Sequence, residues 1–402
     1  MGIIGIVCEY NPFHNGHEYH IKVSKSMLGD DSPVVCVMSG DFVQRGEAAL
    51  YSKFARAEAA CRCGADLVLE LPVPWALSSA EGFARGAVGL LDAFGATHIS
   101  FGSESGEVEP LEKIASSLLD PVITYEVKKL MDKEGNISFP AARQLVLENR
   151  LGELARHLEL PNNILAVEYI KAAYELRSVI KPMTVLRFGS GHDQLGSAGP
   201  KSASELRRMI IDGKDIASHA PAEAEKVFLA EREQGRELGN KNSVELSMLS
   251  RLRMFNEEYY NCLPDAADGL GNRIYKAVQD EATLDAVYSA AKTKRYTLAR
   301  IRRICMCACL GIKAGMNDGI PPYARVLAAN ERGCELLRKQ TNCAKLPLVT
   351  KPASVRDLSK ECLDLFAVGA SAHDFFVLSY KSSAERKGGQ DWRKSPKIVK
   401  NV

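Results

Sequence analysis

Two histidines near the N-terminus, His14 and His17, are the side chains whose spacing and position first suggest chemistry. They follow an apolar run over residues 3–8 that is short and rich in β-branched side chains, as buried strands are. The dipeptide Asn11-Pro12 ends this strand, because proline fixes φ and lacks an N–H, and residues 16–22 then begin a helix. Backbone N–H groups and the helix dipole at such a junction favour a phosphate. The imidazoles could stabilise charge on it, although capping or surface histidines would fit the same pattern.

A second strand, over residues 33–38, places a polar loop beside these histidines. The two strands and the helix between them make a βαβ unit of the expected length. Residues 39–46 then lie at the carboxyl edge of the sheet, where open α/β sheets bind ligands. Asp41, Gln44 and Arg45 are therefore candidates for a phosphate or substrate loop, although a hydrogen-bonded loop network explains them almost as well.

The alternation of strands and helices continues to about residue 215. Strands are expected over residues 65–71, 97–101 and 183–188, and helices over residues 53–64 and 78–94. This pattern predicts an α/β fold with a doubly wound parallel sheet. Residues of about 108–160 read as a helical insertion. Gly102 directly follows the strand expected at residues 97–101. It either lets the backbone approach a flat ring or is simply a turn glycine.

Three further features follow the insertion. A helix opens at Pro161, where Asn162 or Asn163 could cap it or bond a nucleotide. Arg187, at the end of the last strand, would be a phosphate or ribose contact. The segment Lys201–Arg207 carries Ser202, Ser204 and Arg207 at a helix start, where they could receive the β- and γ-phosphates or form a plain serine cap.

Composition bounds the class of protein. With 402 residues the chain is long enough for two domains and a sizeable core. No apolar run reaches the length of a bilayer span, and no basic segment with a cleavage site precedes the first strand, so a cytoplasmic protein is expected. The eleven cysteines are scattered without paired C-x-x-C sets, which indicates a reduced protein without structural zinc and points to no metal-ligating residue.

The formal charge of +2 conceals an asymmetry along the chain. Residues 271–402 carry 24 Lys and Arg against 12 Asp and Glu, whereas residues 1–270 carry 28 against 38. We therefore expect small-molecule chemistry in a catalytic domain over residues 1–215 and binding of a polyanion by a helical, basic domain over residues 216–402. The candidates for gripping RNA are Lys292, Lys294, Arg295, Tyr296, Arg300 and Arg303, with Tyr296 stacking on a base. A solvated basic face is the simpler alternative.

The His-x-Gly-His pattern and the Lys201–Arg207 segment resemble the two signatures of the nucleotidyltransferase and class I aminoacyl-tRNA synthetase superfamily. Over most of its length the chain resembles one family more closely, the bacterial tRNA(Met) cytidine acetate ligases. The matching blocks are Gly5–His17, Met38–Gly46, Phe101–Glu104, Pro161–Leu165 and Lys294–Thr297. The first block is long and specific, whereas the Ser202, Ser204 and Arg207 match is looser.

The resemblance implies an ATP-dependent ligase. ATP and acetate would form acetyl-adenylate, and the acetyl group would pass to N4 of the wobble cytidine (C34) of elongator tRNA(Met), with no membrane or DNA involved. His14 and His17 would be catalytic, because they stabilise charge during attack on the α-phosphorus. Mg²⁺ bridging the phosphates is expected. The implied ATP contacts are Val7, Cys8, Glu9, Tyr10, Asn11, Pro12, Phe13, His14, Asn15, Gly16, His17, Glu18, Tyr19, His20, Gly102, Asn162, Arg187 and Phe188.

Two other classes share parts of this pattern. A nucleotidyltransferase of a cofactor pathway, acting on a small phosphate-containing substrate, would use the same ATP site without needing a basic helical domain. A non-catalytic RNA-binding protein could retain the fold and the basic helix and carry out no reaction.

Overall fold

A single sheet forms the centre of the molecule. The computed structural model describes residues 2–135, 137–187, 201–238, 241–267, 269–341 and 343–400. Within them, eight strands pair in the order β10-β8-β5-β2-β1-β6-β7, with β9 beside β8. Five are parallel: β1 (Ile4–Cys8), β2 (Val34–Ser39), β5 (Leu67–Leu71), β6 (His98–Ser103) and β7 (Lys181–Leu186). The predicted doubly wound fold is confirmed, and the order reverses at β1, where such sheets bind ligands.

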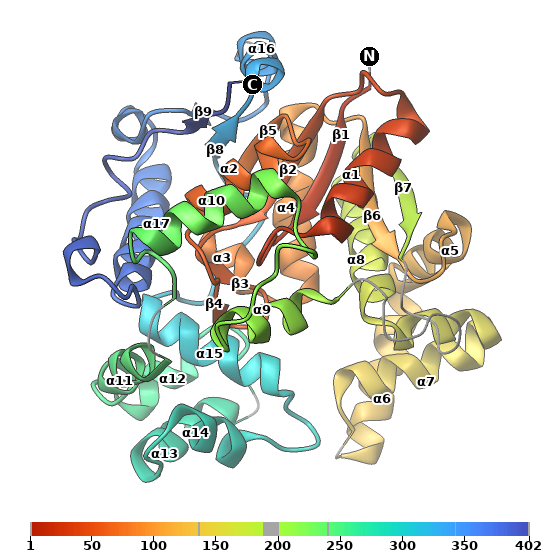
Figure 1. Ribbon diagram of the computed structural model, residues 1–402. Coiled ribbons are helices and arrows are strands. Elements are labelled where there is room, and N and C mark those ends of the chain that lie inside the picture. Colours follow the sequence, from red (N-terminus) through yellow and green to blue (C-terminus); the bar gives the residue numbers. More distant parts are fainter. Residues whose placement is uncertain are drawn as a thin grey trace.

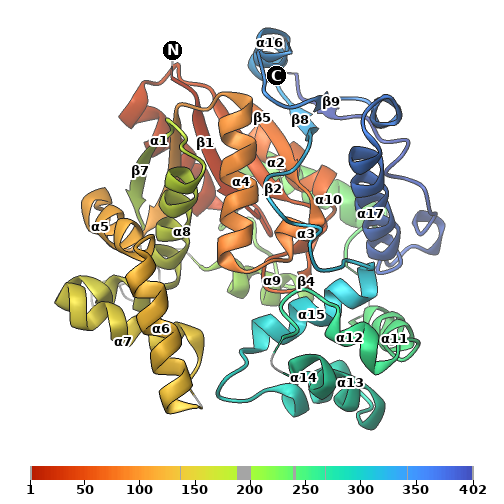
Figure 2. The same cartoon turned by 180° about the vertical axis from the view of Figure 1, so that it is seen from behind.

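Alternate side chains of the central strands meet different helical layers. Val35 and Val37 pack toward α4 (Ala80–Phe94) and α8 (Pro161–Glu175). Val34, Cys36 and Met38 pack toward α1 (Asn15–Leu28), α2 (Lys53–Arg62) and α10 (Ala222–Glu233). The two layers lie on opposite faces of the sheet (Figures 1 and 2). Because both faces are covered, β2 is buried throughout, which explains its unbroken apolar sequence.

The segment expected to be a helical insertion is helical. It contains α5 (Val108–Leu118), α6 (Pro121–Glu134), α7 (Phe139–Leu151) and the 3₁₀ helix η1 (Gly152–Glu159). These helices extend away from the middle of the sheet, below the end of β7 in Figure 1.

A second, helical group follows the sheet-forming part. Its elements are α9 (Ala203–Ile211), α11 (Lys241–Leu252), α12 (Glu257–Asn261), α13 (Leu270–Asp280), α14 (Leu284–Ala291) and α15 (Leu298–Leu310). Cys305, Cys307 and Cys309 of α15 are buried in the core of this group. Among the described residues, no helix is long and apolar enough to cross a membrane.

The part of the chain expected to be mainly helical, residues 216–402, also contributes strands at its C-terminal end. Strand β8 (Ala324–Ala329) pairs antiparallel with β5, and the short strands β9 (Leu348–Val349) and β10 (Lys397–Ile398) pair with β8. The alternation of elements therefore resumes after the helical group, and the sheet is not confined to residues 1–215. Periodicity could not identify β8, because a six-residue segment that is apolar except for Arg325 and buried throughout reads equally well as part of a buried helix.

The remaining elements connect these parts. They are the hairpin of β3 (Phe42–Val43) and β4 (Glu47–Ala48), α3 (Val73–Ala76), α16 (Glu331–Gln340), η2 (Pro352–Asp357), α17 (Lys360–Val377) and η3 (Ser383–Glu385). The hairpin packs against α15 through Gly46, whose φ is +75° and where a Cβ would lie 2.5 Å from the backbone nitrogen of Arg303. Only glycine allows both that backbone conformation and that approach. The hairpin thus joins the edge of the sheet to the helical group.

Candidate active site at the edge of the sheet

The loop between β1 and α1 is held in one conformation by buried contacts. Tyr10 has a φ of 44°, an unusual value for a bulky residue, and its hydroxyl lies 3.4 Å from the Cys36 sulfur. Asn11 Oδ1 accepts a 2.8 Å hydrogen bond from the backbone N–H of Leu50. The Tyr10 ring contacts the rings of Phe13 and His17 at 4.8 Å. The loop therefore presents its histidines from a packed base.

His14 and His17 form a stacked pair at the start of α1. His14 is the N-cap residue, and its Nδ1 accepts the N–H of Gly16 at 3.0 Å. His17 Nδ1 accepts the N–H of His14 at 3.3 Å, and the two ring centroids are 3.7 Å apart. The capping role that the sequence left open is therefore confirmed for His14. These bonds place the proton of each neutral ring on Nε2, so each ring keeps one donor for a ligand.

Electrostatics keep this pair uncharged. Burial and the nearby positive charge of Arg187 lower the pKa of His14 to about 4. Burial, followed by the charges of His14 and Arg187, lowers the pKa of His17 well below its usual range. Neutral imidazoles donate hydrogen bonds without adding to the local positive charge. Arg187 supplies a positive charge beside the two rings.

Gly102 and Arg187 lie together beside the histidines. Gly102 lies in β6, where it pairs with Val185 of the neighbouring strand β7, and Arg187 directly follows β7. A Cβ on Gly102 would lie 3.0 Å from Arg187 Cγ, so the glycine makes room for the arginine side chain across the strand. The structure thus brings these two predicted residues to the same place. Phe188, the neighbouring predicted residue, lies outside the described residues.

Asn162 meets an acidic residue from the neighbouring loop. Glu104 Oε1 accepts from Asn162 Nδ2 at 2.6 Å, and Glu104 Oε2 accepts from the N–H of Asn163 at 2.9 Å. The expectation that Asn162 or Asn163 caps α8 is wrong, since Leu160 is the N-cap and no side chain caps it. The Glu104 carboxylate fills the anion position at this helix start, and Pro161 supplies the first helical residue.

The second signature segment reaches back to the first. Arg207 Nη1 donates to the backbone oxygen of Asn11 at 2.9 Å, and Nη2 donates to Ser204 Oγ at 3.1 Å. Ser202 is the N-cap of α9, where its hydroxyl and the Glu205 carboxylate form a capping box. The plain serine cap therefore accounts for Ser202, whereas Arg207 lies against the loop that carries the histidines.

The three residues predicted to form a phosphate or substrate loop, Asp41, Gln44 and Arg45, lie in two different places. The backbone N–H of Gln44 donates to Glu9 Oε1 at 2.8 Å, and its side chain donates to the Ser78 oxygen at 3.3 Å. Burial raises the pKa of Glu9. The hydrogen bond from Gln44 and the charges of Arg56 and Arg207 lower that pKa, but burial outweighs them. Arg45 is exposed. Gln44 and Arg45 thus belong to the edge that holds Glu9 and Arg207.

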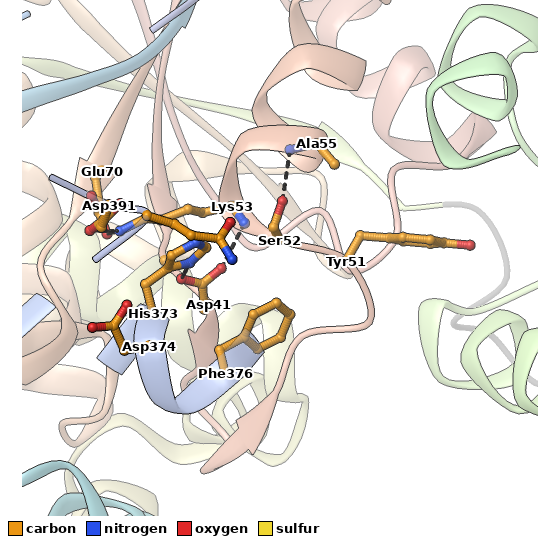
Figure 3. Close-up of polar contacts among 12 residues, drawn as sticks. Asp41, Tyr51, Ser52, Lys53, Ala55, Glu70, His373, Asp374, Phe376 and Asp391 are labelled. Atoms are coloured by element: carbon orange, nitrogen blue, oxygen red, sulfur yellow. Dashed lines mark hydrogen bonds and ion pairs between the residues drawn. The ribbon is translucent and has the colours of Figure 1, made fainter. Parts of the chain in front are cut away.

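Asp41 belongs instead to a buried polar network. Its Oδ2 lies 2.8 Å from His373 Nδ1 of α17, and its Oδ1 accepts the N–H of Lys53 at 2.8 Å (Figure 3). Burial raises the pKa of Asp41, but the charge and hydrogen bond of His373 and the contacts of Lys53 outweigh it and lower the pKa to about 2. The hydrogen-bonded loop network that the sequence left open therefore explains Asp41.

Four charged side chains continue this network. Lys53 Nζ donates to Glu70 Oε1 at 2.7 Å and to Asp391 Oδ2 at 2.9 Å, and Arg325 donates to both Asp391 oxygens at 2.7 and 2.9 Å. All four side chains are less than 10% exposed. Figure 3 shows Glu70, Asp391 and Lys53 converging from separate parts of the chain. The network fastens residue 391 to the sheet.

Arg56 is a site residue that sequence reasoning missed. It is fully buried, and its guanidinium donates to the backbone oxygens of Glu9, Gly40, Ser39 at 3.2 Å and Tyr51 at 3.0 Å. It thereby ties together the carboxyl ends of β1 and β2. In the sequence it is one basic residue in an alanine-rich helix, and only its apolar neighbours indicated that it is buried.

The residues expected to grip RNA differ in exposure. Lys292 and Lys294 are exposed, and Arg295 and Arg300 are partly exposed. The Tyr296 ring is buried beneath the guanidinium groups of Arg295 and Arg300, 5.9 and 5.5 Å from its centroid. The ring expected to stack on a base is therefore covered by its own chain in this structure. Arg303 is also buried, with its Nη2 3.4 Å from Asp265, so it supports α15 from within.

Known proteins resemble this chain over nearly its full length. Residues 1–391 match the family described as HIGH Nucleotidyl Transferase. The tRNA(Met) cytidine acetate ligase of Thermoanaerobacter sp. (strain X514) is 38% identical over 398 residues, covering 96% of this chain and 97% of the relative. That of Acetivibrio thermocellus is 34% identical over 412 residues, covering 98% of each.

Solved structures agree with these sequence matches. The crystal structure of Thermotoga maritima TmcAL bound with alpha-thio ATP has a TM-score of 0.92 and 31% identity to this chain, covering 100% of both. The apo crystal form of the same protein gives the same values. The similarity therefore extends to the helical group and to the C-terminal strands as well as to the parallel sheet.

Proposed function

We propose an activity from the premise that this chain belongs to the HIGH nucleotidyl transferase family and, within it, to the tRNA(Met) cytidine acetate ligases. The chain uses ATP to activate acetate and acetylates N4 of the wobble cytidine (C34) of elongator tRNA(Met). One observation supports this most strongly. Two neutral histidines and the cations Arg187 and Arg207 converge on the β1–α1 junction, in a chain similar to one crystallised with an ATP analogue.

In the first step, a carboxylate oxygen of acetate attacks the α-phosphorus of ATP. The bond to the β-phosphate breaks, pyrophosphate leaves, and acetyl-adenylate forms. Negative charge increases on the leaving phosphates, and the Nε2–H groups of His14 and His17 and the N-terminus of α1 supply donors for it. Arg187 adds a positive charge at the same place. Arg207 holds the loop that carries both histidines.

Magnesium is the expected counter-ion of the triphosphate. Among the described residues, no group of three or more potential ligands could form a cage for it. Phosphate oxygens and water suit Mg²⁺, which keeps several waters in nucleotide sites. When bound, the ion would neutralise part of the phosphate charge, and the residues above would orient the nucleotide.

In the second step, N4 of the cytidine attacks the carbonyl carbon of acetyl-adenylate. The bond to the phosphate oxygen breaks, AMP leaves, and the nitrogen loses a proton. We infer that the exposed residues Lys292 and Lys294, with Arg295 and Arg300, bind tRNA phosphates. They lie on the helical group that contacts the β3–β4 hairpin. The hairpin connects this basic surface with Gln44 and Glu9 at the nucleotide site.

Mass analysis of tRNA incubated with the protein, ATP and labelled acetate tests this function. One acetyl group on elongator tRNA(Met) is expected, and unlabelled tRNA would refute the proposal. Substituting His17→Ala separates catalysis from binding, since losing one donor to a developing charge costs about a hundredfold or more in rate. A rate unchanged by H17A would favour a protein that binds RNA without catalysis at this motif. Transfer to a small phosphate compound in place of tRNA would favour the cofactor-pathway alternative.

A further inference from the structure

His20 is joined to two buried serines by a closed set of hydrogen bonds. His20 Nε2 lies 2.9 Å from Ser100 Oγ, and Ser100 Oγ lies 2.7 Å from Ser24 Oγ. Ser24 Oγ donates to the backbone oxygen of His20 at 2.7 Å. Ser24 and Ser100 are 0% and 1% exposed, so water does not compete for these bonds. The side chains come from α1 and β6, beside the histidine pair.

Counting protons fixes the direction of each bond. The Ser24 hydroxyl has one proton, and that proton goes to a carbonyl oxygen, which can only accept. Ser24 Oγ must then accept the Ser100 proton. Ser100 Oγ is left with lone pairs, so His20 Nε2 must be the donor to it. In the neutral ring this leaves Nδ1 of His20 without a proton.

The free nitrogen of His20 thus differs in kind from those of the other two rings. His14 and His17 keep Nε2–H donors, whereas His20 keeps an Nδ1 acceptor. Among the described residues Nδ1 has no hydrogen-bond partner, and His20 as a whole is only half-buried, so this acceptor is left for a ligand. Burial, with the nearby charge of Arg187, lowers the pKa of His20 to about 4, which keeps the ring neutral near pH 7.

We propose that His20 Nδ1 accepts a hydrogen bond from a donor group in the nucleoside part of ATP. Ser100 and Ser24 are then positioning residues, because their hydrogen bonds hold His20 in the tautomer with a free Nδ1. The inference rests on the proposed ATP site. Phosphate oxygens of ATP only accept hydrogen bonds at neutral pH, so an acceptor cannot recognise them. The donors that ATP offers are the ribose hydroxyls and the exocyclic amine of adenine. His20 lies one helical turn beyond His17, farther from the phosphate-binding start of α1.

Two substitutions at His20 separate its two nitrogens. Asn places an amide oxygen near the position of Nδ1 and loses the link to Ser100, whereas Gln reaches Ser100 and loses the acceptor at Nδ1. We expect H20Q to weaken ATP binding about tenfold and H20N to weaken it less, as measured by calorimetry without acetate or tRNA. Thermal midpoints check that both variants are folded. Equal affinities of H20Q and the unaltered protein would overturn the proposal.

Nucleotide analogues identify the donor. The unaltered protein should bind one of 2′-deoxy-ATP, 3′-deoxy-ATP and N6,N6-dimethyl-ATP about tenfold more weakly than ATP, and H20Q should show no further loss with that analogue. A loss of the same size in both proteins for every analogue would refute a contact with His20. If the unaltered protein does not bind ATP, the proposed function fails with it. If it binds ATP and H20Q binds equally well, only the present inference fails.

The role of the serines has its own signature. Imidazole ¹⁵N spectra distinguish a protonated ring nitrogen from a free one, and we expect His20 to carry its proton on Nε2. S100A should shift His20 toward a mixture of tautomers and weaken ATP binding severalfold, while kcat at saturating ATP changes little. A purely structural role would lower the thermal midpoint of S100A and leave the tautomer and the affinity unchanged, which would contradict the proposal.

Discussion

The substitution Asp391→Asn should destabilise the protein far more than its position near the end of the described chain would suggest. Asp391 is fully buried and accepts three charge-assisted hydrogen bonds: one from Lys53 at 2.9 Å and two from Arg325 at 2.7 and 2.9 Å. Asparagine retains one acceptor and turns an N–H₂ group toward cationic donors. Two buried cations then share the single carboxylate of Glu70. Breaking a buried charge pair costs about 3–5 kcal/mol, and because the amide oxygen placed at Oδ2 keeps two of the three hydrogen bonds we expect about 3 kcal/mol.

Urea titration followed by tryptophan fluorescence measures this loss. Trp392 is the residue after Asp391, and its ring packs 4.5 Å from that of Phe366, so its emission reports on the affected segment. The matched control is D364N, since Asp364 pairs with Lys360 where the two side chains are 59% and 85% exposed. An exposed pair contributes at most about 1 kcal/mol. A free energy of unfolding for D391N within about 1 kcal/mol of the unaltered protein would refute the reasoning.

Three further outcomes are expected. The free energy of unfolding should fall as the pH drops below 6.5, because unfolded His14 binds a proton near pH 6.5 whereas the pKa of folded His14 is about 4. The free energy of unfolding should be lower by about 3 kcal/mol at pH 4, and H14N should lose less. A free energy of unfolding that does not vary with pH would contradict this prediction. R207M should slow ATP–pyrophosphate exchange about tenfold, because the Arg207 guanidinium donates a hydrogen bond to the backbone oxygen of Asn11 in the loop that carries the histidines. The control is R208M, since Arg208 is exposed. The double charge reversal of Lys294 and Arg295 should weaken tRNA binding and reduce its salt dependence while ATP affinity stays unchanged.

The sequence predicted the parallel sheet well because its strands are buried on both faces. Such strands appear as continuous apolar runs separated by helices, as residues 33–38 do. The same reasoning missed β8, whose partner β5 lies more than 250 residues earlier in the chain. Local patterns contain no information about a pairing of that kind. The return of the C-terminal segment to the sheet was therefore beyond sequence reasoning.

The candidate site was predicted where chemistry depends on residue type and position, and mispredicted where it depends on a distant partner. His14, Gly102, Arg187 and Arg207 do converge, since strand ends and helix starts meet at one edge of a parallel sheet. The sequence position of Asp41 also predicted that it lies at that edge. Its carboxylate is instead hydrogen-bonded to His373, more than 300 residues away in the chain. A charged side chain is assigned to a site or to a structural network only when its partner is known.

The order in which the chain is synthesised gives the buried charge network another consequence. Lys53 and Glu70 are made early, but their partners Arg325 and Asp391 are made more than 250 residues later. At about 5–20 residues per second, the 255 residues between Glu70 and its partner Arg325 take roughly 13–50 s to synthesise. Until β8 emerges, β5 is an unpaired edge strand of sequence Leu-Val-Leu-Glu-Leu. The nascent protein therefore exposes an aggregation-prone edge during that interval, and chaperones that bind extended apolar segments should recognise it there.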